Sequence, residues 1–426
     1  KVIGHSCWLP WCGLESPWYL ETDSWKDDMP SEVQSLCSFA SIEGYLQWSG
    51  ALTKALHHRE QSDPLAFQWI EDTYEVVQQQ AFECWQHRGR YWNTELSKTY
   101  FESWRMSSEG ASHEAADDTW AVILHRLQRL PERLSGGVCA PSSCEEEEVR
   151  RRIMPRFLSR KLQFDFDLPV PEKEFLQVME LSHWSQLKLD FVVGGVDSCG
   201  TNSLFKGLSQ AEEIIFTMEE TEEDPFFFKH DSLLPYRREV ESFNHEWLGK
   251  TSTSGPASRT LSLGLRHPGL FHSHRVRLAL RDIPRLKVLL VLCDPLSRLE
   301  KRFWLQYQCE VNHFAMSQTG RCFRSLKAAL EEPDLLQQVA FANHFQQLQR
   351  LFDPQRLRVI HQASFRQSFA EVFVDLSQFL GVKRPLALKA GRYNHHGGHR
   401  SDLCRNASLV ADLKDLLSSE YRAVEE

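Results

Sequence analysis

The chain has 426 residues with 42% hydrophobic and 25% charged content, the composition of a globular protein long enough for two or three domains. Its formal net charge of −9 excludes a general attraction to nucleic acid. No run of about 18 apolar residues occurs, so no segment of this chain is expected to span a membrane.

The first part of the chain, residues 1–155, is predicted to form a small, mostly helical, cysteine-rich domain. Leu65, Trp69, Tyr74 and Val77 recur there at roughly helical spacing. Six of the eleven cysteines lie in this part, which favours disulfides and an oxidising compartment, with reduced, buried thiols as the alternative. The six are Cys7, Cys12, Cys37, Cys84, Cys139 and Cys144.

Residues 156–186 are predicted to form a linker, which contains Pro169 and Pro171. From residue 187 onward, apolar runs of four to seven residues alternate with helical stretches. The runs lie in LDFVVGG, EEIIFTM, RLKVLLVLCDP and RLRVIHQASF. Buried strands alternating with helices indicate an α/β domain over residues 187–426, with a mainly parallel sheet flanked by helices.

A glycine-rich turn follows the first of these strands, in the sequence VGGVDSCGTNSL at residues 193–204. In open parallel sheets, ligands bind beyond the carboxyl ends of strands, and helix N-termini attract anions. Gly195 and Gly200 have the spacing of a nucleotide-hydrolysing P-loop, but Thr201 and Asn202 stand where that loop has Lys and Ser or Thr. The turn predicts an anion site that is not such a loop, and a tight turn without a ligand is the alternative.

The same turn resembles the 5′-phosphosulfate loop of sulfotransferases, commonly V-G-x-P-[KR]-[SC]-G-T-[TS]-x-L. Two later segments resemble further elements of that family in the same order: KVLLVLCDPLSRLEKRFW and RLRVIHQASFRQSFAEVFVDLSQFLGV. The resemblance covers roughly residues 187–425 and implies a P-loop-like sheet that uses 3′-phosphoadenosine 5′-phosphosulfate (PAPS) as co-substrate. It implies donor contacts at Gly195, Ser198, Cys199, Gly200, Thr201, Asn202 and Ser203.

The chain departs from the family pattern where cations are expected. Asp197 replaces the proline of the loop, and Ser198 replaces its basic residue, which stabilises the sulfuryl group during transfer. Cys293 and Lys301 stand where the family usually has the Arg and Ser that hold the 3′-phosphate. Arg298, Lys301 and Arg302 lie at the start of the next predicted helix and are expected to replace these contacts, with ordinary surface charge as the alternative.

A hydroxyl acceptor loses a proton as it attacks, so a base is expected near the sulfuryl group. Carbohydrate sulfotransferases often carry a Glu followed by two aromatic residues at +3 and +4, and EEDPFFFKHD is similar. Glu223 is therefore the first candidate base, Asp224 the second and His230 the third, while Lys229 is the candidate cation for the leaving group. A solvated acidic loop anchored by phenylalanines is the alternative.

Two basic segments are candidates for further contacts. The loop AGRYNHHGGHRSDLC resembles the one that closes over the nucleotide in many sulfotransferases, and its histidines match no standard zinc spacing. Its expected donor contacts are Arg392, Asn394 and Arg400. Residues 265–287 are expected to form a basic mouth for an acidic or polyhydroxylated acceptor, or else the wet face of an amphipathic helix. The cations are Arg266, His272, His274, Arg275 and Arg277.

The cysteines carry separate expectations. A disulfide between Cys309 and Cys322 would close a short loop, whereas Cys199 and Cys293 are expected to be small buried fillers rather than nucleophiles. The segment GVCAPSSCEEEEV resembles the nose-resistant-to-fluoxetine N-terminal domain, an extracellular, cysteine-stapled module. That resemblance implies that the two cysteines of this segment are disulfide-bonded.

Taken together, the residues and resemblances predict a PAPS-dependent sulfotransferase that acts on a hydroxyl of a carbohydrate-type acceptor. The expected location is the secretory pathway, as a Golgi-lumenal or secreted protein, and the sequon Asn406-Ala407-Ser408 agrees with a glycoprotein. The alternative is a non-catalytic binding protein with a degenerate sulfotransferase fold, which the loss of basic residues at 198 and 293 favours.

Overall fold

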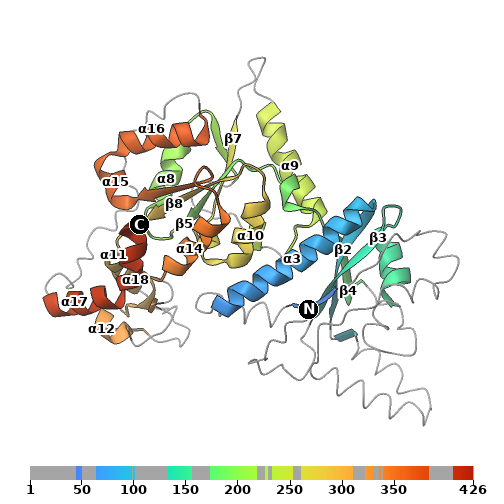
Figure 1. The fold of residues 1–426 in the computed structure, drawn as a ribbon, viewed down its shortest axis with the longest axis horizontal. Helices are drawn as coiled ribbons and strands as arrows, with labels where there is room; N and C mark the ends of the chain where they lie inside the picture. The colour runs from blue at the N-terminus through green and yellow to red at the C-terminus, as the bar shows by residue number, and fades with distance from the viewer. Residues whose placement is uncertain are drawn as a thin grey trace, which may run out of the picture. The chain divides into compact units, whose positions relative to one another are not determined.

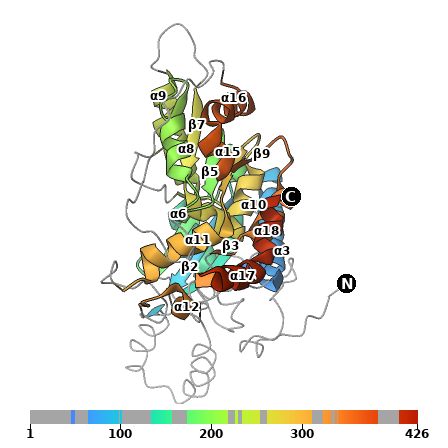
Figure 2. The same cartoon turned by 90° about the vertical axis from the view of Figure 1, so that its left-hand side faces the viewer.

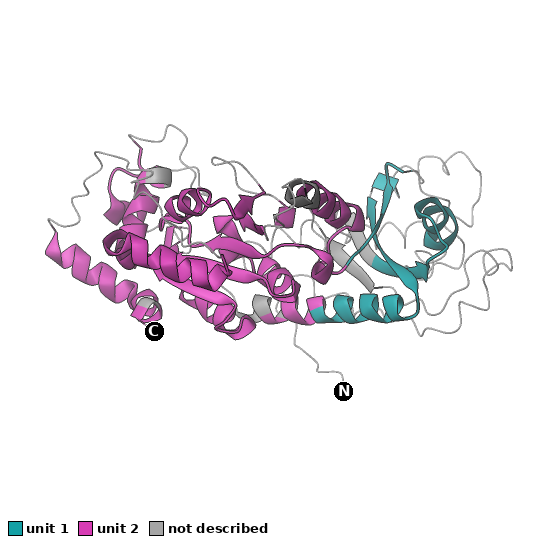
Figure 3. Cartoon of the chain, turned by 90° about the horizontal axis from the view of Figure 1, so that it is seen from above, with its two compact units in different colours: residues 1–55, 75–182 teal, residues 56–74, 183–426 magenta. Residues whose placement is uncertain are grey.

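Figure 1 and Figure 2 show the fold of the chain, as a computed structural model, in two views. The structure describes residues 45–49, 64–97, 99–100, 133–155, 173–217, 226–228, 233–252, 261–309, 322–330, 335–336, 339–382 and 406–425. The chain forms two compact units (Figure 3). Unit 1 comprises residues 1–55 and 75–182, and unit 2 comprises residues 56–74 and 183–426.

Unit 1 contains a four-stranded antiparallel sheet in the order β1-β3-β2-β4. The strands are β1 (Tyr45–Ser49), β2 (Gly89–Ser97), β3 (Arg133–Pro141) and β4 (Leu176–Glu180). The sequence prediction for this part was a mostly helical domain with no strand specified, because these strands pair across long sequence separations and their residues are as polar as they are apolar. β4 lies within the stretch 156–186 that the sequence predicted as a linker.

Two helical segments accompany this sheet. Helix α3 (Pro64–Gln86) belongs to unit 2 up to Tyr74 and to unit 1 from Glu75, and a disulfide between Cys84 and Cys139 joins it to β3. Helix α6 (Glu146–Glu148) begins with a capping box between Glu145 and Glu148 and continues into a π-helical turn, Val149–Ile153. Cys144 is also disulfide-bonded. The prediction that both cysteines of GVCAPSSCEEEEV form disulfides is therefore confirmed, and Cys139 pairs with Cys84.

Unit 2 contains a five-stranded parallel sheet in the order β6-β7-β5-β8-β9 (Figure 1). The strands are β5 (Phe191–Gly195), β6 (Ile214–Phe216), β7 (Ser262–Arg266), β8 (Lys287–Leu292) and β9 (Leu357–His361). Every residue of the central strand β5 is buried, as its unbroken apolar sequence predicts. The predicted α/β class with a mainly parallel sheet flanked by helices is confirmed, and β7 is the strand that the prediction lacked.

Helices lie between these strands in the chain and after the last of them, β9. They are α8 (Thr201–Leu208), α9 (Arg237–Ser252), α10 (His274–Asp282), α11 (Pro295–Arg302), α12 (Leu326–Ala329), α14 (Ala342–Leu351), α15 (Gln362–Gln367), α16 (Phe369–Leu380), α17 (Ala407–Leu416) and α18 (Ser418–Glu425). Short helical turns lie at η2 (Trp184–Gln186), η3 (Phe226–Phe228), η4 (Pro268–His272) and η5 (Phe303–Tyr307). No helix among the described residues is long and apolar enough to cross a membrane.

The C-terminal helices lie beside α11 in both views (Figures 1 and 2). Leu413 of α17 and the neighbouring Leu417 share a buried apolar cluster with Leu299 and Phe303. Glu420 of α18 accepts hydrogen bonds of 2.7 Å from two backbone amides at the start of α14. The end of the chain therefore supports α11 and α14, which both reach the site described next.

Candidate anion-binding site

The turn between β5 and α8 has a backbone that depends on its glycines. Gly195 has a φ of 147° and Gly200 a φ of 109°, in the region that residues with a Cβ atom rarely adopt. A Cβ atom on Gly195 would lie 2.6 Å from the Cβ atom of Phe271 in η4. Ser198 is also left-handed, with a φ of 64°. The glycines thus allow β5 to end against η4 and the chain to enter α8 directly.

The start of α8 leaves backbone donors available. Gly200 is the N-cap, and no side chain caps the helix. Among the described residues, no acceptor binds the amide hydrogens of Gly200, Thr201 or Asn202. Uncapped amides and the positive end of the helix dipole together attract an anion. The arrangement of strand, glycine turn and helix is the one that the sequence predicted.

Two side chains from other elements hold the carbonyl groups of this turn. Lys301 of α11 donates from Nζ to the Ser198 carbonyl at 3.0 Å, and Gln362 of α15 donates from Nε2 to the Cys199 carbonyl at 2.6 Å. Burial lowers the pKa of the Lys301 ammonium, and the nearby charge of Arg366 lowers it further. A cation therefore lies against the turn even though position 198 itself carries none.

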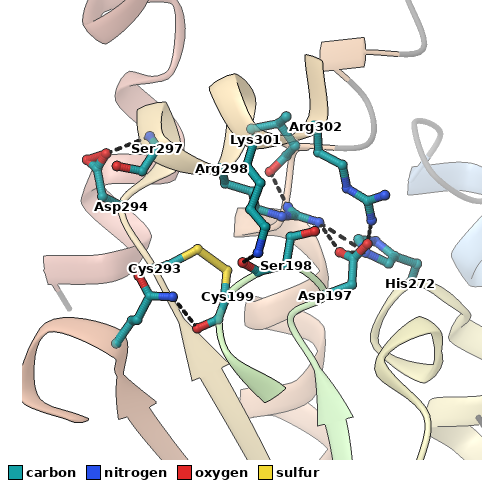
Figure 4. Close-up of a disulfide and its surroundings, with 12 residues drawn as sticks. Asp197, Ser198, Cys199, His272, Cys293, Asp294, Ser297, Arg298, Lys301 and Arg302 are labelled. Carbon is teal, nitrogen blue, oxygen red and sulfur yellow. Dashed lines mark hydrogen bonds and ion pairs between the residues drawn. A yellow bond between two sulfur atoms is a disulfide. The ribbon is translucent and has the colours of Figure 1, made fainter. Parts of the chain in front are cut away.

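Asp197 is the centre of an ion-pair cluster on the opposite side of the turn (Figure 4). Its Oδ1 atom accepts a hydrogen bond of 2.6 Å from Arg298, and His272 Nε2 lies 3.5 Å from the same oxygen. Arg302 pairs with the other carboxylate oxygen. Lys301 bonds to the Ser198 carbonyl, so α11 brings three cations to the turn against the one Asp197 carboxylate, and the formal charge of these four groups is 3 − 1 = +2.

Arg298, which the sequence predicted as a contact for the 3′-phosphate, is fully buried, so the alternative of an ordinary surface charge is wrong. It donates from NH1 to the Val339 carbonyl at 2.6 Å in addition to its bond with Asp197. Burial lowers the pKa of its guanidinium to about 9, which leaves it charged at neutral pH. Arg298 thus holds Asp197, a residue of the turn, against α11.

A disulfide between Cys199 and Cys293 joins the turn to the end of β8 (Figure 4). The sequence prediction of two separate buried fillers was therefore wrong, although both residues are indeed buried. β5 and β8 are neighbours in the sheet, so their carboxyl ends, and the residues that follow them, lie within bonding distance. The predicted disulfide between Cys309 and Cys322 is confirmed.

In the connection between β8 and α11, side chains occupy the positions where a ligand could bind the N-terminus of α11. Asp294 caps α11 by accepting a hydrogen bond of 2.8 Å from the Ser297 amide, and Pro295 occupies the first helical position. Tyr421 of α18 donates its hydroxyl to the other Asp294 oxygen at 2.9 Å. Burial and this hydrogen bond raise the pKa of Tyr421 to about 12.

A buried histidine–arginine cluster lies next to Asp197. Arg277 donates to Nδ1 of His344 at 3.2 Å and lies 3.3 Å from Nδ1 of His274. Burial lowers the pKa of His274 to about 3 and that of His344 well below its usual value, with the charge of Arg277 adding to both shifts. Both imidazoles are therefore neutral, and the His344 ring lies 5.3 Å from that of His272.

The burial of three of its five cations contradicts the predicted basic mouth. His274 and Arg277 are fully buried and Arg266 is 4% exposed, whereas His272 and Arg275 are partly exposed. Arg266 ends β7, bonds to the side-chain oxygen of Asn202 and lies over the Phe205 ring. It therefore supports α8 from within rather than contacting an acceptor.

Several predicted site residues fall outside the described residues. They are Glu223, Asp224, Lys229, His230, Arg392, Asn394 and Arg400. The phenylalanines after Glu223 and Asp224 are described: Phe227 is buried, and its ring stacks on Trp184 at 5.1 Å. Arg275 lies beside this turn, 3.5 Å from the Phe227 carbonyl.

Sequence reasoning missed Gln362 and the supporting roles of His272 and Arg266. Gln362 directly follows β9 and Arg266 ends β7, so both stand at the carboxyl ends of parallel strands. Their location at strand ends was the signal available in the sequence. For Arg266, using that signal required predicting β7. Among the described residues, no group of His, Cys, Asp and Glu side chains is arranged to hold a metal ion.

No protein-family model matches the chain, and no curated protein matches its sequence. Solved structures that are similar to part of it include two sulfotransferases. A sulfotransferase from Alicyclobacillus acidocaldarius is 17% identical with a TM-score of 0.39, over 56% of this chain and 94% of that chain. The sulfotransferase domain from the curacin biosynthetic pathway is 10% identical with a TM-score of 0.31, over 47% of this chain and 76% of that chain.

Proposed function

We propose that the chain is a PAPS-dependent sulfotransferase that transfers a sulfuryl group to a hydroxyl of a carbohydrate-type acceptor. The observation that carries the proposal is the β5–α8 turn, where uncapped amides at Gly200–Asn202 lie beside the Lys301 ammonium. The three segments that resemble sulfotransferase elements fold as β5–α8, β8–α11 and β9–α16. Their strands are neighbours in one parallel sheet, so all three connections open at the same edge.

The turn fits a phosphosulfate group in charge and in donor type. The amides of Gly200, Thr201 and Asn202 would bind the anionic oxygens. The other predicted donor contacts of the turn would line the site around them: Gly195, Ser198, Cys199 and Ser203. Lys301 supplies the nearby cation, and Arg298 would act by holding Asp197. Arg392, Asn394 and Arg400 are proposed to close over the nucleotide.

Sulfuryl transfer moves negative charge onto the leaving phosphate oxygen, so a cation there stabilises the transition state. Lys229 is proposed for that role. The acceptor hydroxyl gives up its proton to Glu223, with Asp224 as the second candidate. Between these candidates in sequence, Phe227 is buried and its ring stacks on Trp184.

A non-catalytic binding protein is the second candidate, and Asp197 is the observation that favours it. This carboxylate stands in the turn itself and occupies Arg298 and Arg302, two cations that a donor would otherwise attract. Position 293, where the resembling enzymes have a phosphate-binding Arg, is part of a disulfide. In this case the N-terminal unit, which resembles the nose-resistant-to-fluoxetine domain, would be the working part.

Calorimetric titration with adenosine 3′,5′-bisphosphate tests donor binding directly. Binding supports the enzyme, and no binding leaves the second candidate. Transfer of labelled sulfate from PAPS to a carbohydrate panel then separates enzyme from binder. Glu223→Ala should abolish transfer, whereas Glu241→Ala, on the exposed face of α9, is the matched control and should retain it. Full transfer by Glu223→Ala would refute the base assignment.

We also propose a lumenal or secreted location, with which the disulfides of both units are compatible. Asn406 is exposed and caps α17 through its side-chain oxygen, which accepts from the Leu409 amide at 3.1 Å. Its amide nitrogen, the atom that a glycan would join, takes no part in that cap. Enzymatic deglycosylation of the secreted protein should increase its gel mobility, and Asn406→Gln should remove the shift.

A further inference from the structure

The Cys199–Cys293 disulfide connects two adjacent strand-to-helix connections. β5 and β8 run parallel with Val193 opposite Leu289, so the chain leaves both strands at the same edge of the sheet. The two cysteines are 94 residues apart in sequence, yet their Cα atoms lie 5.2 Å apart. This separation is ordinary for a disulfide. The bond thus ties the glycine turn to a rigid central strand.

Three tethers from three elements meet at two consecutive residues of the turn. Lys301 of α11 holds the Ser198 carbonyl, Gln362 of α15 holds the Cys199 carbonyl, and Cys293 after β8 holds the Cys199 side chain. Cys199 is fully buried and Cys293 is 5% exposed. The next residue, Gly200, begins the run of uncapped amides. The tethers therefore act at the point where the anion-binding backbone starts.

Backbone amides bind an anion strongly only when they are already oriented, because ordering a flexible turn costs free energy on binding. Glycines at 195 and 200 give this turn more freedom in isolation than other residues would. A covalent bond beside Gly200 removes that freedom before any ligand arrives. No side chain at 198 or 293 offers a cation, so binding depends on the oriented amides together with the Lys301 ammonium beside them.

We infer that the Cys199–Cys293 disulfide is a positioning element of the donor site, which fixes the β5–α8 turn for an adenosine 3′,5′-bisphosphate-type anion. It takes the place of the two basic residues that the resembling enzymes have at these elements. The inference rests on the proposed function. The cysteines touch no reacting atom; they act through the amides of Gly200, Thr201 and Asn202.

The test compares two disulfides of the same unit. The double variant Cys199→Ser/Cys293→Ser removes the tether. The control variant, Cys309→Ser/Cys322→Ser, removes a disulfide between cysteines that are 13 positions apart in sequence. Calorimetry measures the dissociation constant of adenosine 3′,5′-bisphosphate for each protein. The first variant should bind at least about tenfold more weakly, a loss of about 1.4 kcal/mol. The second should bind within about twofold of the wild type.

Kinetics add a readout that a purely structural role would not move. The first variant should raise KM for PAPS while leaving KM for the acceptor unchanged. If the wild type does not bind the bisphosphate, the proposed function fails. If the wild type binds and the Cys199→Ser/Cys293→Ser protein binds equally well, the inference alone is overturned.

A second measurement keeps the inference testable if that variant does not fold. Coupling between equilibria is reciprocal, so a ligand that depends on the tether must also stabilise it. In the wild-type protein, saturating bisphosphate should lower the equilibrium constant for reduction of Cys199–Cys293 by about tenfold or more, and leave that of Cys309–Cys322 unchanged. Differential alkylation with mass spectrometry, after equilibration in thiol–disulfide buffers, measures both equilibria. Equal reduction of Cys199–Cys293 with and without bisphosphate would contradict the inference.

Discussion

Two strand-to-helix connections at the same edge of the parallel sheet differ in how the N-terminus of the helix is capped. The β8–α11 connection caps itself: Asp294 accepts from the Ser297 amide and Tyr421 holds the other carboxylate oxygen. The β5–α8 connection has glycine at the N-cap and no side-chain cap. A self-capped helix already has a carboxylate at its positive end, whereas an uncapped one leaves that place to a ligand.

The self-capped helix contributes in another way. α11 projects Arg298, Lys301 and Arg302 from its later turns toward the neighbouring connection. One connection therefore presents amides and the other presents cations. The comparison shows that a binding turn without basic residues of its own can receive positive charge from a helix that lies beside it in the fold.

The largest disruption of this contrast should come from Asp197→Ala. Removing the carboxylate leaves Arg298 buried without its anionic partner, which should lower the unfolding free energy by about 2–4 kcal/mol. This loss is somewhat smaller than for a fully buried ion pair, because Asp197 is partly exposed. Urea denaturation measures the loss. Asp197→Asn keeps an acceptor oxygen and should lose less. Glu241→Ala breaks the exposed pair with Arg237 and should change stability by less than about 0.5 kcal/mol. Similar losses for all three would contradict the cluster.

The glycine turn can be tested with two adjacent alanine substitutions. Gly195→Ala combines an unfavourable φ of 147° with a Cβ position 2.6 Å from Phe271, and should destabilise by about 2–3 kcal/mol. Gly194→Ala is the matched control, since its Cβ would meet only Val288, at 3.8 Å. That variant should lie within about 0.5 kcal/mol of the wild type. Equal stabilities in thermal and urea unfolding would remove the steric explanation of the turn.

Acid should weaken the histidine cluster beside Asp197. His274 is neutral in the folded protein because its pKa is lowered to about 3, whereas in the unfolded chain it binds a proton near its usual value. Its stabilising contribution is therefore present above about pH 6.5 and is lost as the pH falls toward 3. Between pH 7 and pH 5.5 the loss should be about 1 kcal/mol, and His344 acts in the same direction.

The measurement for this prediction is unfolding free energy against pH for the wild type and His274→Gln. The glutamine oxygen can still accept from Arg277, but the side chain does not titrate. The variant should therefore have the flatter acid limb. Identical slopes would show that His274 is not the group responsible.

The smallest effect should follow loss of the α11 cap. Asp294→Ala removes the acceptor for the Ser297 amide and should cost about 1 kcal/mol. Asp294→Asn keeps a capping oxygen and should cost only a few tenths of that. Thermal unfolding compares the two, and an equal loss would show that the cap oxygen is unimportant.

Local patterns predicted part of this molecule. The apolar runs of β5, β8 and β9 and the Cys309–Cys322 loop are readable because their determinants are close in sequence. β7 was missed because SLGLR is short and contains Gly264, whose lack of a side chain admits the Phe191 ring. The Cys199–Cys293 bond depends on strand order, which places β5 beside β8, and no local pattern encodes that order. Asp197 was read as a departure from a motif, while its partners on α11 came from the fold.

Helix α3 has a practical consequence for dissecting the chain. Its first half belongs to the parallel-sheet unit: Tyr74 is fully buried and donates to Asp282 at 2.6 Å, and Glu71 pairs with Arg350. A truncation that starts at residue 187 would delete both groups and leave Asp282 and Arg350 without them. An expression vector for the transferase unit alone therefore has to encode residues 56–74 as well, for example fused ahead of residue 183.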